Sequence, residues 1–77
     1  MTLTELAPGE TATIASIDTT DVAVQRLMVL GLVEGAELTY VRSSFGGDPL
    51  EFRLYGGAIS LRREQAERFT VATVSRG

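Results

Sequence analysis

Alternating apolar and polar positions predict a chain of short strands. Over residues 50–54, Leu50, Phe52 and Leu54 alternate with charged side chains, so these three are expected to face inward from one strand. Further strands are expected over residues 11–17, 37–43, 58–61 and 69–74, with a short helical turn over residues 62–68. Turn-forming residues separate these runs at roughly eight to twelve positions, a spacing typical of a small β-rich domain.

One helix is predicted within this series, over residues 21–30. Leu27 and Leu30 recur at helical spacing, and both are expected in the core. Gly31 follows where a left-handed cap is favoured, and Leu32 is placed to contact Leu27 as in a Schellman ending. The helix is therefore expected to end at Gly31.

Glycines and prolines mark the tight turns. Pro8 and Gly9 suit a type II turn, and Gly35 takes the third position of a second one. Gly56-Gly57 suits a two-residue hairpin turn, which needs positive φ. About five strands and one helix can bury their apolar faces only by curling the sheet on itself. The sequence thus predicts a mainly β fold, a small partly open barrel, as a single domain over residues 1–77.

Cys, His, Lys and Trp are all missing from the 77 residues. Without Cys there is no disulfide, thiolate nucleophile or structural zinc site, and without His there is no imidazole base near neutral pH. Without Lys there is no Schiff base. Only carboxylate and carbonyl oxygens remain as metal ligands. We therefore expect no enzyme activity, no cofactor and no metal site.

The charge pattern also limits the partners. The formal net charge is −3, and the arginines are spread along the chain, so nucleic-acid binding is not expected. The longest apolar helical stretch falls short of the ~20 residues needed to cross a bilayer, and no secretory signal is recognised at the N-terminus. We expect a cytoplasmic protein without direct membrane insertion.

A few exposed side chains are candidates for binding a partner protein. Arg26 and Met28 flank the apolar face of the predicted helix, where a methionine beside an arginine makes an adaptable contact surface. Phe45 lies in the loop before residue 50, and either folds back onto the domain or meets a partner.

Two charged candidates complete this set. Asp48 is expected to hydrogen-bond local backbone in an Asx-type turn, with a partner or ion contact as the alternative. Arg62, next to Arg63, either helps to form an anion site or pairs with Glu64 or Glu67 on a solvated face.

Four short motifs, in this order and spacing, carry a resemblance. They are Leu3-x-x-Leu6-x-Pro8-Gly9, Arg26-Leu27-x-x-Leu30-Gly31-Leu32-x-x-Gly35, Gly47-Asp48-Pro49 and Leu61-Arg62-x-x-x-Ala66. Together with a final Val71, the chain from Leu3 to Val74 resembles the FeoA family, ferrous iron transport protein A and its relatives. Glu34 departs from the pattern, because family members often have proline there.

The resemblance implies an SH3-like β-barrel of about five strands, with a helix inserted after the first strand and a helical turn before the last. It also implies a cytosolic partner of FeoB, the membrane ferrous-iron transporter with a GTPase domain. The family is often described as transition-metal binding, but this sequence has neither His nor Cys.

Three hypotheses follow. The first is an accessory protein that binds and modulates the FeoB-type transporter through protein contacts, recruited by it to the inner face of the membrane. The second is a free-standing metal-responsive domain like the one at the C-terminus of DtxR-type repressors. The third is an SH3-like peptide-binding module, for which few aromatic residues are available to line a groove. Weak pairing of copies through open strand edges stays an open alternative.

Overall fold

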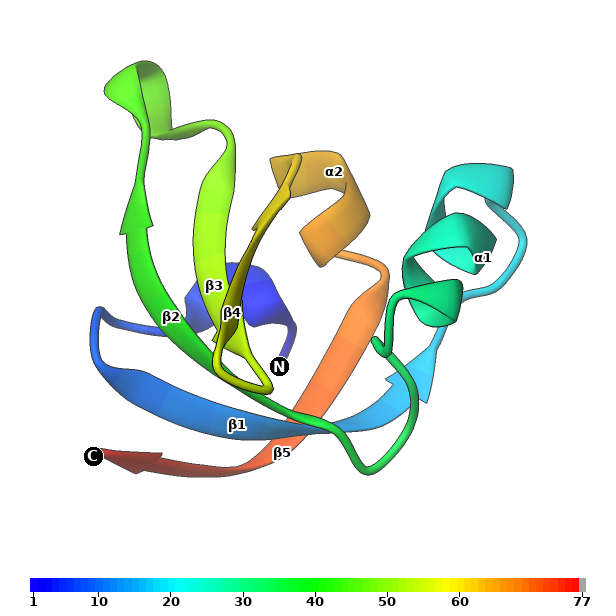
Figure 1. The fold of residues 1–77 in the computed structure, drawn as a ribbon, viewed down its shortest axis with the longest axis horizontal. Coiled ribbons are helices and arrows are strands. Elements are labelled where there is room, and N and C mark those ends of the chain that lie inside the picture. Colours follow the sequence, from blue (N-terminus) through cyan, green and yellow to red (C-terminus); the bar gives the residue numbers. More distant parts are fainter. Residues whose placement is uncertain (77) are drawn as a thin grey trace.

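The computed structural model describes residues 1–76 and shows one antiparallel sheet curled on itself (Figure 1). In chain order the elements are η1 (Leu3–Glu5), β1 (Glu10–Ile17), α1 (Val22–Val29), β2 (Glu37–Ser43), η2 (Phe45–Gly47), β3 (Leu50–Leu54), β4 (Gly57–Leu61), α2 (Arg63–Ala66) and β5 (Phe69–Arg76). The five strands lie in the order β4-β3-β2-β1-β5. The mainly β, SH3-like fold with one inserted helix is confirmed, and the predicted strands agree within two residues at each end.

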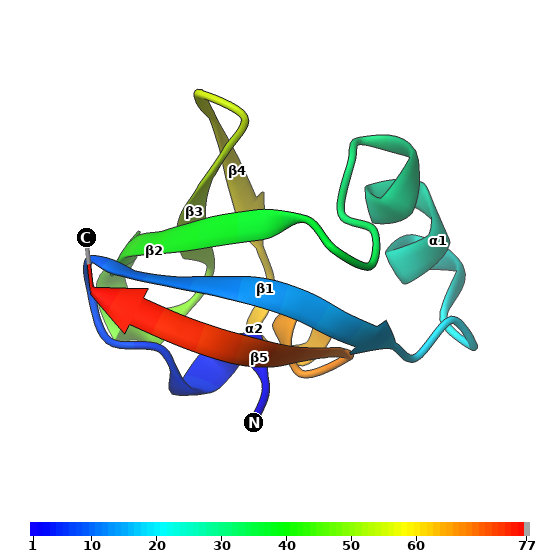
Figure 2. The same cartoon turned by 90° about the horizontal axis from the view of Figure 1, so that it is seen from below.

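Irregular pairing bends the sheet into the partly open barrel. The register of β1 against β5 shifts twice, and that of β2 against β3 shifts between Tyr40 and Arg42. Such bulges bend a strand and increase its twist. Figure 2 shows the result, with β5, β1 and β2 side by side and β3 and β4 rising steeply from that layer. At the other side of β5, the Val71 N–H donates a hydrogen bond to the Met1 carbonyl (2.8 Å), so the N-terminal segment covers part of that edge.

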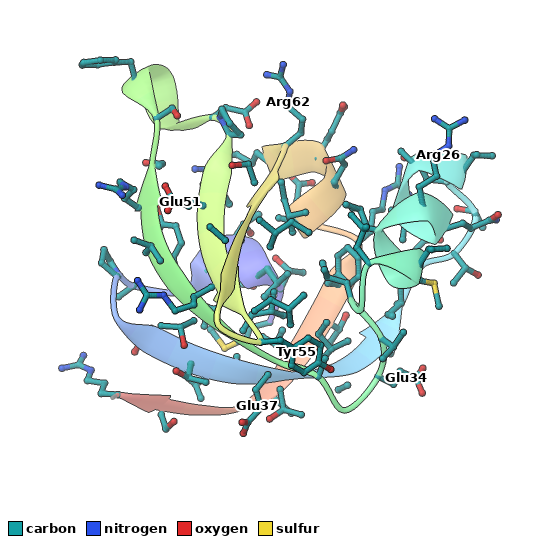
Figure 3. All side chains as sticks on the ribbon, in the orientation of Figure 1. Arg26, Glu34, Glu37, Glu51, Tyr55 and Arg62 are labelled. Atoms are coloured by element: carbon teal, nitrogen blue, oxygen red, sulfur yellow. The ribbon has the colours of Figure 1, made fainter. Side chains whose placement is uncertain are left out.

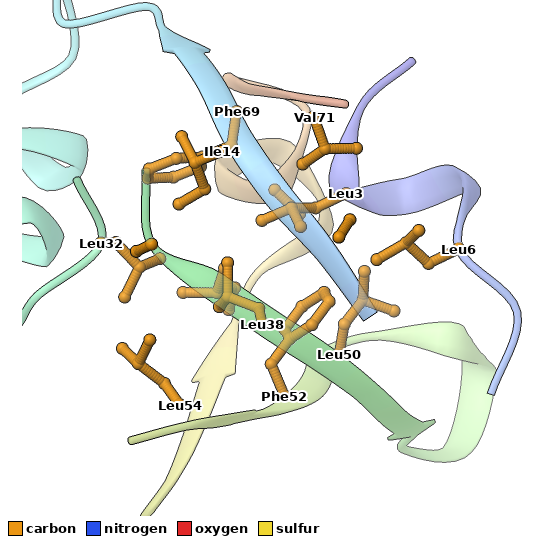
Figure 4. Close-up of a cluster of buried hydrophobic side chains, with 14 of the residues drawn as sticks. Leu3, Leu6, Ile14, Leu32, Leu38, Leu50, Phe52, Leu54, Phe69 and Val71 are labelled. Atoms are coloured by element: carbon orange, nitrogen blue, oxygen red, sulfur yellow. The ribbon is translucent and has the colours of Figure 1, made fainter. Parts of the chain in front are cut away.

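The barrel interior holds one continuous apolar cluster (Figure 4). Leu50, Phe52 and Leu54 all point into it, which confirms the alternation in β3. Leu3 and Leu6 enter from the η1 segment, which contacts α2 and β5. Among the side chains that the structure describes, the buried class contains no polar or charged one. The interior therefore serves packing alone.

The α1 helix begins at the Asp21 cap, whose carboxylate accepts a hydrogen bond from the Ala23 N–H (2.9 Å). It ends in the expected Schellman pattern. The Leu32 N–H donates to the Leu27 carbonyl (3.3 Å), and Leu32 itself is buried.

The prediction that Leu30 lies in the core is wrong, because its side chain is 63% exposed. Val24 lies on the buried face of the helix, and Leu27 is half-buried beside it. At 3.6 residues per turn, Leu30 lies about 120° around the helix from Val24, so its side chain is carried past the barrel. Leu32 fills the core position instead, because the chain reverses at Gly31.

The hairpin between β3 and β4 turns one residue earlier than predicted. Leu54 pairs with Gly57, so the turn residues are Tyr55 and Gly56, with φ of 51° and 79°. Tyr55 is a bulky residue in a left-handed conformation, which is uncommon. Its ring packs against α1: a Cβ added at Gly31 would lie 3.0 Å from the Tyr55 Cε2. This contact joins the hairpin to the end of the helix.

The loop after β1 is tied to the start of β5 by a pair that was not expected from the sequence. The Asp18 N–H donates to the Arg68 carbonyl (2.8 Å), and the Arg68 Nη1 donates to the Asp18 carboxylate (2.8 Å). The Thr20 hydroxyl (2.7 Å) and the Thr20 backbone N–H donate to the same carboxylate. These bonds, led by the hydroxyl of Thr20, lower the pKa of Asp18 to about 2.

This shift predicts a pH dependence of stability. A carboxylate whose pKa is lowered by folding stabilises the fold above its unfolded pKa of about 4, and that contribution is lost as the pH falls toward 2. Between pH 4 and 2, urea unfolding of the wild type should therefore lose more stability than that of Asp18→Asn. Glu37→Gln, which removes an exposed carboxylate, is the control and should follow the wild type. Parallel curves for wild type and Asp18→Asn would contradict the role of Asp18.

A second prediction concerns Gly31, where the positive φ favours glycine and the nearby Tyr55 ring leaves little room for a Cβ. Gly31 has φ of +112° and touches the Tyr55 ring, whereas Gly35 has φ of +90° with open space around it. Gly35→Ala should lower the free energy of unfolding by about 1–2 kcal/mol through backbone strain. Gly31→Ala should lower it further, and adding Tyr55→Ala should recover part of the difference. Equal losses for the two glycine variants in urea titrations would refute the Tyr55 contact.

Candidate partner-binding site

The loop between β2 and β3 presents a fully exposed aromatic side chain. Phe45 lies at the start of η2 and makes no shielding contact with the barrel. The loop around it is closed by two backbone hydrogen bonds, from the Ser44 N–H to the Pro49 carbonyl (3.0 Å) and from the Gly47 N–H to the Ser44 carbonyl (2.9 Å). Of the two outcomes expected for Phe45, folding back onto the domain is therefore not observed.

The start of α2 holds this loop in place. The Asp48 carboxylate accepts a hydrogen bond from the Arg63 N–H (2.9 Å), and the Arg63 guanidinium donates to the Gly47 carbonyl (2.8 Å). Arg62 reaches the other Asp48 oxygen more loosely, with its Nη1 at 3.9 Å. We call these contacts of Gly47, Asp48, Arg62 and Arg63 the α2 bracket. It fixes the base of the Phe45 loop from a distant part of the chain.

The α2 bracket corrects two predictions. Asp48 bonds to Arg63 rather than to local backbone, and Arg62 and Arg63 turn to the loop rather than to Glu64 or Glu67. The reason is the register of the β3–β4 hairpin. Leu50 lies opposite Leu61, so the residues just before Leu50 meet those just after Leu61.

A shallow hollow of about 340 Å³ adjoins Phe45. It is lined by Arg42, Ser43, Ser44, Phe45, Pro49, Glu51 and Ser60. Arg42 pairs with Glu51 on its rim (3.1 Å), and the hydrogen bond from Arg42 to Glu51 raises the pKa of the guanidinium above its usual value. The hydroxyls in the hollow have no histidine to activate them. The hollow therefore offers an aromatic side chain and charged groups for a contact.

The predicted contact residues fall into two groups. Phe45, Asp48 and Arg62 come together at the Phe45 loop, whereas Arg26 and Met28 lie on α1. Figure 3 shows Arg62 projecting from the start of α2 and Arg26 projecting from α1. Arg26 is exposed, and Met28 is half-buried. The structure therefore does not unite all five residues in one site.

Sequence reasoning missed two residues of this surface region. Arg63 was named only as the neighbour of Arg62, and Tyr55 was not among the candidates. The signal for Arg63 lies in the hairpin register, which follows from counting outward from the glycine turn. The signal for Tyr55 is a bulky residue directly before Gly56, in a position that requires positive φ.

Two further observations concern metals and membranes. Within the described chain, residues 1–76, Asp and Glu side chains do not gather in groups of three or more that could hold a metal ion. Over the same residues, no helix has the length and apolar character required to cross a bilayer.

Comparison with known proteins finds relatives that are named for ferrous iron transport. It is 33% identical over 75 residues, 97% of its length, to an Fe(2+) transport protein A/Fe(2+) transporter FeoB fusion protein of Porphyromonas gingivalis, and spans 9% of that relative. FeoA of Chlorobium tepidum is 41% identical, with a TM-score of 0.84 over 92% of this chain and 68% of that one. FeoA of Stenotrophomonas maltophilia, an SH3 domain protein solved with zinc, is 32% identical, with a TM-score of 0.86 over 99% and 96%.

A manganese-dependent transcriptional repressor shares the fold at 18% identity, with a TM-score of 0.82 over 95% of this chain and 41% of that one. The resemblance noted in the sequence is confirmed, since the family model for the FeoA domain matches residues 1–73. The chain belongs to the FeoA family, and its Porphyromonas gingivalis relative is named as an Fe(2+) transport protein A fused to the transporter FeoB.

Proposed function

We propose that this protein is an accessory protein of ferrous iron transport that binds an FeoB-type transporter from the cytosolic side and modulates it through protein contacts. The observation that carries the proposal is the relative in which protein A and the transporter FeoB form one chain. Fusion holds two modules at high effective concentration. A separate chain needs a docking surface to achieve the same proximity.

The Phe45 loop supports such docking. Aromatic side chains and arginines dominate the binding energy of protein interfaces. Here a fully exposed Phe45 lines a hollow together with Arg42, and Arg62 approaches Asp48 at the base of the same loop. Burying a phenylalanine side chain contributes about 1.5–3 kcal/mol. Because the α2 bracket already orders the loop, little conformational freedom is lost on binding.

A binding role also agrees with the absence of buried polar groups from the described interior. The core of the described residues is wholly apolar, and the exposed hydroxyls have no base. We propose that the protein performs no catalysis and that ferrous iron is the cargo of its partner. The likeness to the manganese-dependent repressor concerns the fold, so the regulatory alternative has less support than transporter binding.

The first prediction for this function concerns Phe45. Wild-type protein should bind the immobilised cytosolic part of the FeoB-type transporter from the same genome, and Phe45→Ala should weaken binding about tenfold or more, because an interface anchor is lost. Val74→Ala, which truncates another partly exposed apolar residue, is the control and should bind like the wild type. Unchanged affinity of Phe45→Ala would remove Phe45 from the interface. No binding by the wild type in any nucleotide or iron condition would overturn the proposed function.

The α2 bracket generates a second prediction. Asp48→Ala leaves Phe45 in place but removes the acceptor for the Arg63 N–H. Amide exchange at Gly47 should become faster, and transporter binding should weaken by a smaller factor than in Phe45→Ala, since the loop must be ordered on binding. Glu64→Ala removes an exposed carboxylate from α2 itself and is the matched control. Faster exchange with unchanged binding would show that loop order does not matter.

A further inference from the structure

We propose that a second surface of this protein binds a basic segment of its partner, in which an arginine or lysine stands beside apolar residues. The surface consists of Leu30, Val33 and Tyr55 with Glu34 and Glu37, and we call it the Tyr55 surface. This inference rests on the proposed function, because it identifies the part of a membrane transporter that would occupy the surface.

Tyr55 is the central residue. Its side chain is 75% exposed although it occupies a left-handed turn position that asparagine or glycine fills more easily. One part of the ring packs against Gly31. The rest is open to solvent, and the face of an aromatic ring attracts guanidinium and ammonium groups.

Apolar side chains continue from Tyr55 onto the end of α1. Gly31, which the ring approaches, directly follows Leu30, which is 63% exposed, and stands two residues before Val33, which is 39% exposed. Scattered exposed apolar residues need no explanation, but a contiguous group marks an interaction site. The Tyr55 surface thus provides an apolar contact next to a cation-attracting ring.

Two carboxylates border this apolar group. Glu37 lines a hollow of about 490 Å³ together with Thr13, Gly35, Ala36 and Tyr55. Glu34 precedes Gly35 in the same turn, and Figure 3 shows Tyr55 between the two glutamates.

Within residues 1–76, neither glutamate has an ion-pair partner, whereas Glu10, Asp18, Asp48 and Glu51 each pair with an arginine. Their charge is therefore free to attract a cationic side chain.

The Tyr55 ring, the apolar side chains and the two carboxylates together fit one class of partner. An arginine can lie on an aromatic ring while its N–H groups donate to carboxylates. Leu30 and Val33 add an apolar contact that a bare cation would leave unused. Cytosolic segments near the ends of transmembrane helices carry an excess of lysine and arginine. A basic juxtamembrane segment of the transporter therefore fits this surface, whereas an anionic lipid surface is repelled by it.

The Tyr55 surface and the Phe45 loop are separate. The Phe45 loop precedes β3 at Leu50, and the Tyr55 turn follows β3 at Leu54. The two ends of this strand are roughly 13 Å apart at about 3.3 Å per residue. One partner can therefore contact both without competition between them.

The test uses the full-length FeoB-type transporter in nanodiscs, which keeps its juxtamembrane segments. The double variant Glu34→Gln/Glu37→Gln should bind about tenfold more weakly than the wild type and show a shallower dependence on salt. Glu64→Gln/Glu67→Gln changes the net charge equally on α2 and should bind like the wild type. Equal binding by wild type and both double variants would overturn this inference and leave the proposed function intact.

A direct readout comes from a synthetic peptide of the transporter's basic juxtamembrane segment. Titrated into labelled protein, it should shift the amide signals of Glu34, Glu37 and Tyr55, and Tyr55→Leu should weaken it because the ring face is lost. Shifts centred elsewhere, or none, would contradict the proposal. Binding of the wild type to protein-free phosphatidylserine vesicles, weakened in Tyr55→Leu, would assign the Tyr55 surface to a lipid and overturn the proposal.

Discussion

The pairing of β3 with β4 determines how both exposed surfaces of this barrel are built. Leu50 opposite Leu61 brings the end of the β2–β3 loop beside the start of α2, where Asp48 and Arg63 bond to each other. Leu54 opposite Gly57 forces Tyr55 into the turn, where its ring meets Gly31. A slip of one residue would reverse the faces of both strands and break both contacts. The hairpin register therefore couples the buried face of β3 to the two surfaces at its ends.

The sequence predicts local features of this fold well, because their causes are local. Alternation identified β3, and Gly31 with Leu32 identified the end of α1. Features that depend on distant contacts were not predicted. The exposure of Leu30 follows from how α1 is rotated against the barrel, and the partner of Asp48 lies fifteen residues away. The Asp18–Arg68 pair spans fifty residues, and no spacing in the sequence indicates it.

The candidate sites show the same division. Phe45 is recognisable from sequence, because an aromatic residue between serine and glycine in a loop is unusual, and the structure shows it fully exposed. The Tyr55 surface is not recognisable, because it joins a hairpin turn to the end of a helix through a single ring contact. The described residues combine an apolar interior with a surface that presents aromatic residues with arginines at one place and with glutamates at another.

Site-specific crosslinking in cells tests the central claim, that this protein contacts the transporter through the Phe45 loop. Phe45 is replaced by a photoreactive benzophenone amino acid, cells expressing both proteins are irradiated, and the crosslinked chain is identified by mass spectrometry. We expect a crosslink to the cytosolic part of the FeoB-type transporter, and none when the same amino acid replaces Val74. Equal crosslinking from both positions, or no transporter adduct from position 45, would contradict a specific contact through Phe45.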